Sequence, residues 1–204
     1  RKKAVTLKNP VHADFFRERF EGEREKTVVA VGRIDENKNH ELLIRAFGGL
    51  AEEFPECRLI IYGDGEKRKE LQRLSEKMGL KERIILPGNA DNVAELIYKA
   101  RVFVLSSNTE GMPNTLIEAM LMGLTVISTD CPCGGPAELI AHGVNGLLTP
   151  VGDVKAMENA LRAVLGVLRR ADEMGREAAK LKESYEAGAV YKSWENYLEK
   201  VMHR

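Results

Sequence analysis

Short apolar runs rich in β-branched residues alternate with longer segments of helical periodicity along most of this chain of 204 residues. Continuous apolar runs of this length are typical of parallel strands that are buried on both faces of a sheet. Regular alternation of strand and helix with short connections predicts an α/β fold, a doubly wound parallel sheet of about six strands. We expect strands at residues 27–31, 58–62, 83–86, 102–105, 125–128 and 146–149. We expect helices at residues 39–54, 66–78, 92–99, 114–122 and 135–141, two more from residue 153 onward, and a last one from residue 185 to about 201.

Composition narrows the class of protein. Lysine and arginine total 31 and aspartate and glutamate total 31, so the net charge is zero, whereas a protein that coats nucleic acid shows a basic excess. No stretch reaches the roughly 18 apolar residues of a membrane helix, and no apolar run near the start resembles a signal peptide. The cysteine count is three, an odd number that fits a reducing compartment better than a disulfide framework. We therefore expect a cytoplasmic protein with no nucleic-acid partner.

The two ends of the chain lie outside the strand–helix alternation. Residues 1–16 have a strand-like start followed by a turn at residues 9–11. In residues 17–26, eight of ten side chains are charged, which predicts a solvated loop before the first strand. The final helix places four large side chains on one face, namely Tyr191, Trp194, Leu198 and Val201. That face either docks on its own domain or reaches toward a second domain.

Common catalytic and metal-binding signatures do not occur in the sequence. There is no Gly-x4-Gly-Lys phosphate loop, no His-Glu-x-x-His, no Gly-x-Ser-x-Gly and no Asp-x-Asp. Cys131 and Cys133 are separated by one residue and no second pair exists, which is poor zinc geometry. The four histidines show no ligand spacing either, so we expect no metal.

The first segment with a chemical pattern is the predicted loop at residues 32–39. Arg33 and Lys38 follow a strand and precede a helix whose predicted N-cap is Asn39. A doubly wound fold binds anions at this position, where arginine can hold two phosphate oxygens and lysine supplies a mobile point charge. Position alone leaves two readings open, a phosphate site and plain solvated charges. The loop contains a single glycine, so the Gly-x-Gly-x-x-Gly fingerprint of dinucleotide enzymes is absent.

The second segment is the loop and helix at residues 106–122. Pro113 suits a first helical turn, and Gly111 allows a ligand to approach the backbone closely. The N–H groups of three residues are then expected to be free and to face a ligand above the sheet, namely Asn114, Thr115 and Leu116.

Two glutamates in this segment can point toward one cavity. Glu110 lies in the loop, and Glu118 lies in the second helical turn among apolar neighbours. A carboxylate there needs a partner, and the hydroxyl groups of a ribose would serve, although a plain surface glutamate remains the alternative. A third segment, residues 128–138, is rich in proline and glycine, and its backbone can also approach a ligand.

Together these segments resemble the carboxyl-terminal, donor-binding domain of the retaining glycosyltransferases of family 4 (glycosyl transferases group 1), which have the GT-B fold. The resemblance covers nearly the whole chain. Its motifs lie in order at residues 9–11, 31–33, 38–39, 61–65, 86–88, 110–114, 118–120, 123–127 and 143–148. Any one motif is weak, but their order and spacing are specific. The glutamates at 110 and 118, separated by seven residues, form the signature of that family.

The resemblance implies a role for each candidate residue. Arg33 and Lys38 would grip the diphosphate of a nucleoside-diphosphate sugar, and Glu118 would bind the ribose hydroxyls. Glu110, the implied catalytic residue, would lie against the donor sugar. The signature loop would lie against the sugar and phosphates with Gly111, Met112, Pro113, Asn114, Thr115 and Leu116. All of these except proline would offer a backbone N–H group. Residues 86–91 would lie beside the base. The family needs no metal or other cofactor, and Cys133 has no implied role.

The resemblance also implies a division of the chain and of the enzyme. Residues 1–26 would be a linker and lead-in, residues 27–184 a Rossmann-like nucleotide-sugar-binding domain, and residues 185–204 a helix that reaches toward an amino-terminal, acceptor-binding domain. The chain would then bind a donor but turn over little or nothing alone. The whole enzyme would transfer a hexosyl group to a glycan or a lipid-linked acceptor, in the cytoplasm or at the inner face of the membrane. A nucleotide-sugar epimerase-like enzyme and a non-catalytic nucleotide-binding module remain alternatives, and the base, sugar, acceptor and oligomeric state stay open.

Overall fold

A computed structural model of the chain describes residues 7–202. Its sheet has six strands, all parallel, in the order β3-β2-β1-β4-β5-β6. The strands are β1 (Thr27–Val31), β2 (Arg58–Tyr62), β3 (Ile84–Gly88), β4 (Val102–Leu105), β5 (Thr125–Thr129) and β6 (Leu147–Thr149). The helices are η1 (Ala13–Phe16), α1 (His40–Gly48), α2 (Arg68–Lys77), α3 (Val93–Ile97), α4 (Asn114–Leu121), α5 (Gly135–Leu139), α6 (Val154–Gly166), α7 (Leu168–Ala179), α8 (Lys182–Tyr185) and α9 (Ala187–Met202). The predicted fold class is confirmed.

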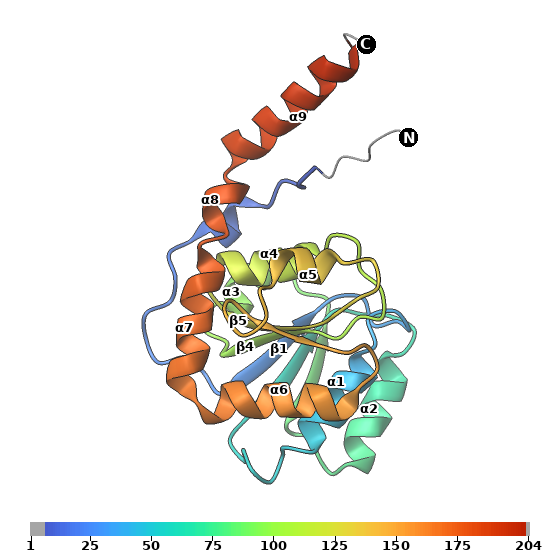
Figure 1. The fold of residues 1–204 in the computed structure, drawn as a ribbon. Helices are drawn as coiled ribbons and strands as arrows, with labels where there is room; N and C mark the ends of the chain where they lie inside the picture. The colour runs from blue at the N-terminus through green and yellow to red at the C-terminus, as the bar shows by residue number, and fades with distance from the viewer. Residues whose placement is uncertain (1–6, 203–204) are drawn as a thin grey trace.

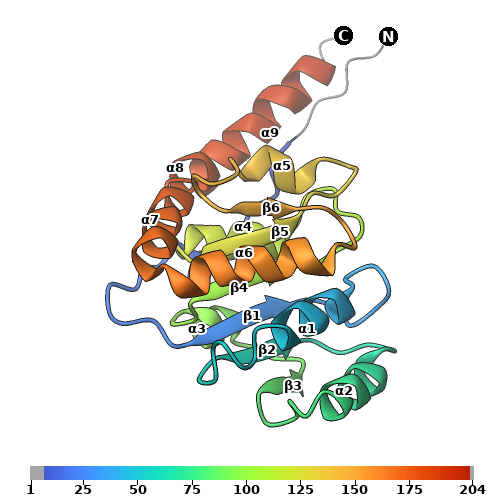
Figure 2. The same ribbon diagram turned by 60° about the horizontal axis from the view of Figure 1, so that its bottom comes forward.

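Helices cover both faces of the sheet. Figure 1 shows α1, α2 and α6 on one face and α3, α4 and α5 on the other, and Figure 2 shows how α6 lies along the strands. Each face has its own cluster of buried apolar side chains. Because the strands are buried on both sides, their sequences are continuous apolar runs rather than alternating ones.

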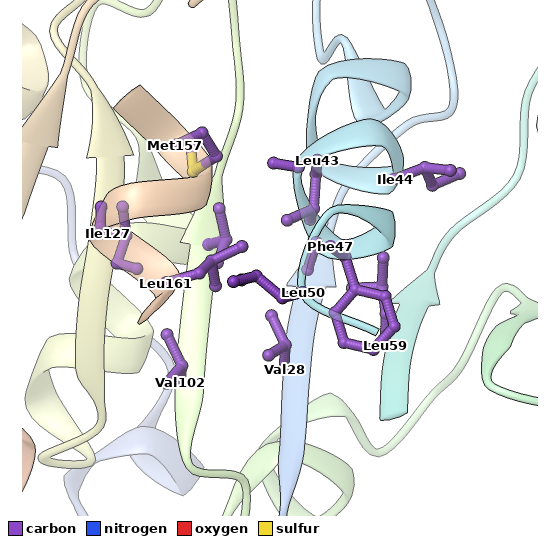
Figure 3. Packing of buried hydrophobic residues seen from close by; sticks show 14 of the residues in the cluster. Val28, Leu43, Ile44, Phe47, Leu50, Leu59, Val102, Ile127, Met157 and Leu161 are labelled. Carbon is purple, nitrogen blue, oxygen red and sulfur yellow. The ribbon is translucent and has the colours of Figure 1, made fainter. Parts of the chain in front are cut away.

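The larger cluster joins α1 and α6 to the sheet. Leu43, Phe47 and Leu50 recur at helical spacing and are almost fully buried. In Figure 3, Leu50 lies beside Leu161 and Phe47 lies beside Leu59 of β2. Removing a side chain of this size from water contributes about 2 kcal/mol. This packing fixes α1, and therefore the loop that precedes it, against the middle of the sheet.

Most helix boundaries differ from the expected ones by one or two residues, and two differences have a structural consequence. The helix predicted at residues 39–54 ends at Gly48, and residues as far as 54 continue as turns. The helix predicted from residue 185 is wrong at its start, because Tyr185 ends the short helix α8 and α9 begins at Ala187. Tyr185 is 1% exposed and packs with Ile117 and Leu121 of α4, so the chain turns at this anchor before α9 starts.

The lead-in is only partly the solvated loop that its charge predicts. Arg24 is 7% exposed and donates hydrogen bonds to the carbonyls of Tyr98, Ala100 and Gly123, which lie just beyond the carboxyl ends of α3 and α4. The side chain of Arg19 is also buried and pairs with Asp172. Burial, with Arg19 nearby, lowers the pKa of Arg24 to about 10. Arg24 therefore satisfies carbonyls at the ends of two helices, which a count of charged residues does not reveal. The strand-like start lies largely in residues 1–6, outside the described residues.

Helix α9 extends away from the body of the molecule beside the start of the described chain (Figure 1). Its four predicted face residues are exposed to different degrees, from 39% for Trp194 to 59% for Tyr191. Trp194 donates its indole N–H to the carbonyl of Lys8, at 3.0 Å. The face therefore does not dock on the sheet domain. None of the helices within residues 7–202 combines the length and apolar character needed to cross a bilayer.

Candidate functional site

The site candidates gather where the strand order reverses, between β1 and β4. The loops that follow these two adjacent strands meet at the carboxyl edge of the sheet, the position at which doubly wound folds bind ligands. Three asparagines join the loops: Asn108 donates its backbone N–H to the carbonyl of Asn37 at 2.7 Å, and Asn39 donates its side-chain amide to Asn108 Oδ1 at 2.9 Å. Asn39 also caps α1, as predicted, from a left-handed backbone conformation (φ 44°) that asparagine tolerates.

This junction brings Lys38 and Glu110 together. The ammonium of Lys38 lies 2.5 Å from Glu110 Oε1, and the hydroxyl of Ser107 donates to the same oxygen at 2.7 Å. The two charged side chains are only 21% and 12% exposed. Two residues that the sequence assigns to separate segments therefore form one charged pair beside the ligand edge.

Ser107 supports the Lys38–Glu110 pair, a role that was not predicted from the sequence. It is fully buried, and its carbonyl accepts hydrogen bonds from Thr129 Oγ1 at 2.5 Å and from the thiol of Cys131 at 3.3 Å. The third segment, residues 128–138, thus contacts Ser107 through Thr129 and Cys131, and Ser107 in turn orients Glu110. Cys131 is buried beside Ser107, while Cys133 is exposed. Serine before an acidic loop carries no distinctive sequence signal.

Arg33 stands apart from this pair. Its side chain is 78% exposed, and its nearest carboxylate is Asp35, at 3.5 Å. Arg33 lines a cavity of about 460 Å³ between the carboxyl ends of β1, β2 and β3. Asn89 and Ala90, from the loop expected beside the base, line the same cavity. Arg33 therefore lies at the carboxyl edge of the sheet, as expected, but on the β2–β3 side, whereas Lys38 lies on the β4 side.

Two glycines allow the loops to close over this edge. At Gly63, whose φ is +138°, an added Cβ would lie 1.9 Å from the carbonyl oxygen of Gly32. Any residue with a side chain there would therefore push the loops after β1 and β2 apart. A Cβ on Gly135 would lie 1.8 Å from the carbonyl oxygen of Gly111, in the signature loop. Gly111 itself has open space around its own Cβ position. The backbone at Gly111 thus packs closely against Gly135 on one side, while the position of its own missing Cβ is free of protein atoms.

Helix α4 begins at Asn114, so Pro113 is its N-cap residue, with an extended backbone, and not part of the first turn as expected. Leu116 does not offer a free N–H as expected, because that group donates to the carbonyl of Pro113 at 3.1 Å. The first turn is tight enough for this bond to form three residues apart. Within residues 7–202, the N–H groups of Asn114 and Thr115 have no protein acceptor, and these two remain available to an anion.

Glu118 lies in the second turn of α4 and is half-buried. Its carboxylate accepts no hydrogen bond from the described residues, and burial raises its pKa, an effect that nearby His12 opposes. His12 comes from the lead-in, which also contacts α4 through a hydrogen bond from Asn9 to the side chain of Asn114, at 3.3 Å. A half-buried carboxylate that has no hydrogen-bond partner in residues 7–202 is a candidate binding group at this edge. The contribution of the lead-in to this edge was not predicted.

No group of three or more His, Cys, Asp or Glu side chains in residues 7–202 is placed to hold a metal ion. The candidate binding groups at this edge are the cations Arg33 and Lys38, the free N–H groups of Asn114 and Thr115, and the carboxylates of Glu110 and Glu118. This set can bind a phosphorylated ligand and contact its hydroxyl groups.

Comparisons with known proteins identify the relatives of this chain. The sequence model of the family described as Glycosyl transferases group 1 matches residues 12–181. An uncharacterized glycosyltransferase of Methanocaldococcus jannaschii is 41% identical over 117 residues, which are 57% of this chain and 29% of that protein. A Campylobacter jejuni protein is 30% identical over 195 residues, which are 95% of this chain and 54% of that protein. The latter is an α-1,4-N-acetyl-D-galactosaminyltransferase that acts on an undecaprenol-linked glycan.

Among solved structures, the Anabaena protein HepE in complex with UDP superimposes with a TM-score of 0.85 and 20% identity. The match covers 95% of this chain and 57% of HepE, and it shows a shared fold, that of the GT-B glycosyltransferases. This chain thus spans about half or less of the length of these proteins.

Proposed function

Because the chain belongs to the glycosyl transferases group 1 family, we propose that it is the donor-binding half of a retaining, metal-independent glycosyltransferase. The whole enzyme would transfer a hexosyl group from a nucleoside-diphosphate sugar to a glycan or lipid-linked acceptor. The observation that carries this proposal is the Lys38–Glu110 pair, which lies at the reversal of strand order beside the free N–H groups of α4. UDP is the first nucleotide to test, because HepE was crystallised with it.

The geometry suggests how the donor is held. The base and ribose would occupy the cavity lined by Arg33, Asn89 and Ala90, with the ribose hydroxyls donating to Glu118. The diphosphate would lie between Arg33 and Lys38, and the N–H groups of Asn114 and Thr115 would contact its oxygens. These residues come from loops fixed by buried strands, so the positive groups are in place before the donor arrives.

The same groups would assist the reaction. When the bond from sugar to phosphate breaks, negative charge grows on the departing nucleoside diphosphate. Arg33, Lys38 and the amino terminus of α4 would stabilise that charge, as a metal does in other sugar transferases. Glu110, which Ser107 orients, would lie against the donor sugar, where it can stabilise positive charge on the ring or a hydroxyl group. The acceptor would come from an amino-terminal domain, toward which α9 and its exposed aromatic side chains would extend.

The acceptor class is proposed from the relatives. The Campylobacter jejuni protein acts on an undecaprenol-linked glycan, so a lipid-linked or polymeric acceptor is the first to test. An enzyme with such an acceptor would work in the cytoplasm, at the inner face of the membrane. Product stereochemistry, read by NMR with the whole enzyme, tests retention of configuration.

Calorimetric titration of the chain with UDP, GDP, ADP and their sugars tests the binding function. Arg33→Ala and Lys38→Ala should each weaken nucleoside diphosphate about tenfold or more, while nucleoside affinity changes little. Arg45→Ala is the matched control, because Arg45 pairs with Glu41 on the outer surface of α1. Equal losses for nucleoside and nucleoside diphosphate would contradict the phosphate role. Binding of nicotinamide dinucleotides with no binding of nucleotide sugars would overturn the proposal, and slow interconversion of the donor sugar alone would favour the epimerase.

A further inference from the structure

A second cavity, of about 250 Å³, lies at the opposite edge of the sheet, beside the amino ends of β1, β2 and β4. Phe54, Pro55, Leu165 and Leu168 form its apolar wall, and Leu168 is 50% exposed. The donor site at the carboxyl edge uses none of these residues. A cavity of this size accepts a ligand somewhat smaller than a drug molecule.

Arg101 brings a charge to this cavity that no carboxylate in the described part of the chain neutralises. It is 9% exposed, and its Nη2 donates to the carbonyl of Arg24 at 2.6 Å. Its Nε is buried and has no hydrogen-bond partner, and no carboxylate in residues 7–202 lies within 4 Å of its guanidinium. A buried cation normally has a counter-ion, because removing it from water is costly.

The neighbours of Arg101 add to this positive character. Arg24 and Arg83 are the other arginines that donate inward at this edge, and they too bond only to backbone carbonyls. At the cavity rim, Glu53 pairs with Arg162 at 2.7 Å and Glu56 pairs with Lys26, so neither carboxylate serves Arg101.

From this arrangement we infer a binding site for a small organic monocarboxylate with an apolar body, such as an aromatic or short aliphatic acid. Its carboxylate pairs with Arg101, and its apolar part packs against Phe54, Leu165 and Leu168. A neutral ligand of the same shape leaves the guanidinium without a counter-ion. A dianion such as phosphate meets the carboxylates of Glu53 and Glu56 and finds no further donors on the apolar wall. A single negative charge on an apolar body suits both parts of the cavity.

The experiment is an NMR titration of the 204-residue chain, labelled at leucine methyl groups, with benzoate, benzamide and inorganic phosphate. We expect benzoate to shift the methyl signals of Leu165 and Leu168 in a saturable way. Benzamide, which has the same shape without the charge, should bind about tenfold more weakly or worse. Arg101→Gln should remove the preference for benzoate. Arg169→Gln is the control, because the side chain of Arg169 is 88% exposed and pairs with Glu173 on α7.

A second variant keeps the test decisive if Arg101→Gln does not fold. Leu168→Asp changes a half-exposed side chain and places a negative charge beside the apolar wall, so benzoate binding should be lost while the fold is retained. Equal affinities for benzoate and benzamide, no saturable shift at millimolar benzoate, or phosphate binding that survives both variants would each overturn the inference. UDP should bind equally with and without benzoate, because the two sites lie at opposite edges of the sheet. This result separates the inference from the proposed donor site.

Discussion

Replacing Glu110 by glutamine should strengthen nucleoside-diphosphate binding, although Glu110 belongs to the proposed site. In the unliganded chain, Lys38 is already paired with Glu110, at 2.5 Å, and both side chains are mostly buried. A bound diphosphate must share the ammonium of Lys38 with Glu110 or displace Glu110 from it. The negative charge of Glu110 also repels that of the diphosphate. Glutamine keeps the size of the side chain and an oxygen that can accept the Ser107 hydrogen bond. It removes only the negative charge.

The magnitude follows from the geometry. Two unit charges about 4 Å apart interact by about 4 kcal/mol at an effective dielectric constant of about 20. That figure is an upper bound, because the glutamine oxygen still accepts hydrogen bonds and water replaces part of the lost interaction. A net change of about 1 to 2 kcal/mol remains, which corresponds to roughly fivefold to thirtyfold tighter UDP binding.

Isothermal titration of both proteins with UDP and uridine measures this difference. Uridine has no phosphate, so its affinity should not change. The gain for UDP should shrink in high salt, which screens the carboxylate–phosphate repulsion. Glu95→Gln is the matched control, since Glu95 is exposed and pairs with Arg17 away from the site. Weaker or unchanged UDP binding in Glu110→Gln would refute the idea that Glu110 and the diphosphate compete for Lys38. An equal gain for uridine would place the effect outside the phosphate site.

Three further predictions concern single residues. Burial raises the pKa of Glu118, and ribose hydroxyls would favour its charged form, so nucleoside binding should release a proton and weaken as the pH falls through that raised pKa. Calorimetry should show that this pH dependence is lost in Glu118→Gln. Burial lowers the pKa of His40 from 6.5 to about 4, so the unfolded state takes up a proton first as the pH falls from 6.5 to 4, and the free energy of unfolding should fall by up to about 3 kcal/mol. Urea unfolding at several pH values should show that His40→Asn lacks this decrease. Gly111→Ala should leave the Tm unchanged but weaken donor binding, whereas Gly135→Ala should lower the Tm by several degrees, because its methyl group would lie 1.8 Å from the carbonyl oxygen of Gly111. A lowered Tm in Gly111→Ala would contradict the open space around Gly111.

Most of the secondary structure was predictable because it depends on local patterns. Six apolar runs became six strands with nearly the expected bounds, since residues buried on both faces of a sheet must be apolar wherever the strand lies. Handedness rules then place the loops after the strands at one edge. For this reason Arg33, Lys38, Glu110 and Glu118 were placed at the ligand edge from the sequence and its family resemblance. The start of α9 was not predictable, because it depends on the burial of Tyr185 against α4.

The partners of the charged residues were decided by tertiary structure alone. The contact between Lys38 and Glu110, 72 residues apart, exists because β1 and β4 are neighbours in the sheet, and no local pattern encodes that order. Burial of Arg24 likewise requires the ends of α3 and α4 to meet the lead-in. The sequence by itself determined the six strands, most of the helices and the edge of the sheet at which their loops gather, through periodicity and chirality. Tertiary structure decided which charges pair, which remain free and how far each is buried, because these depend on packing between segments far apart in the chain.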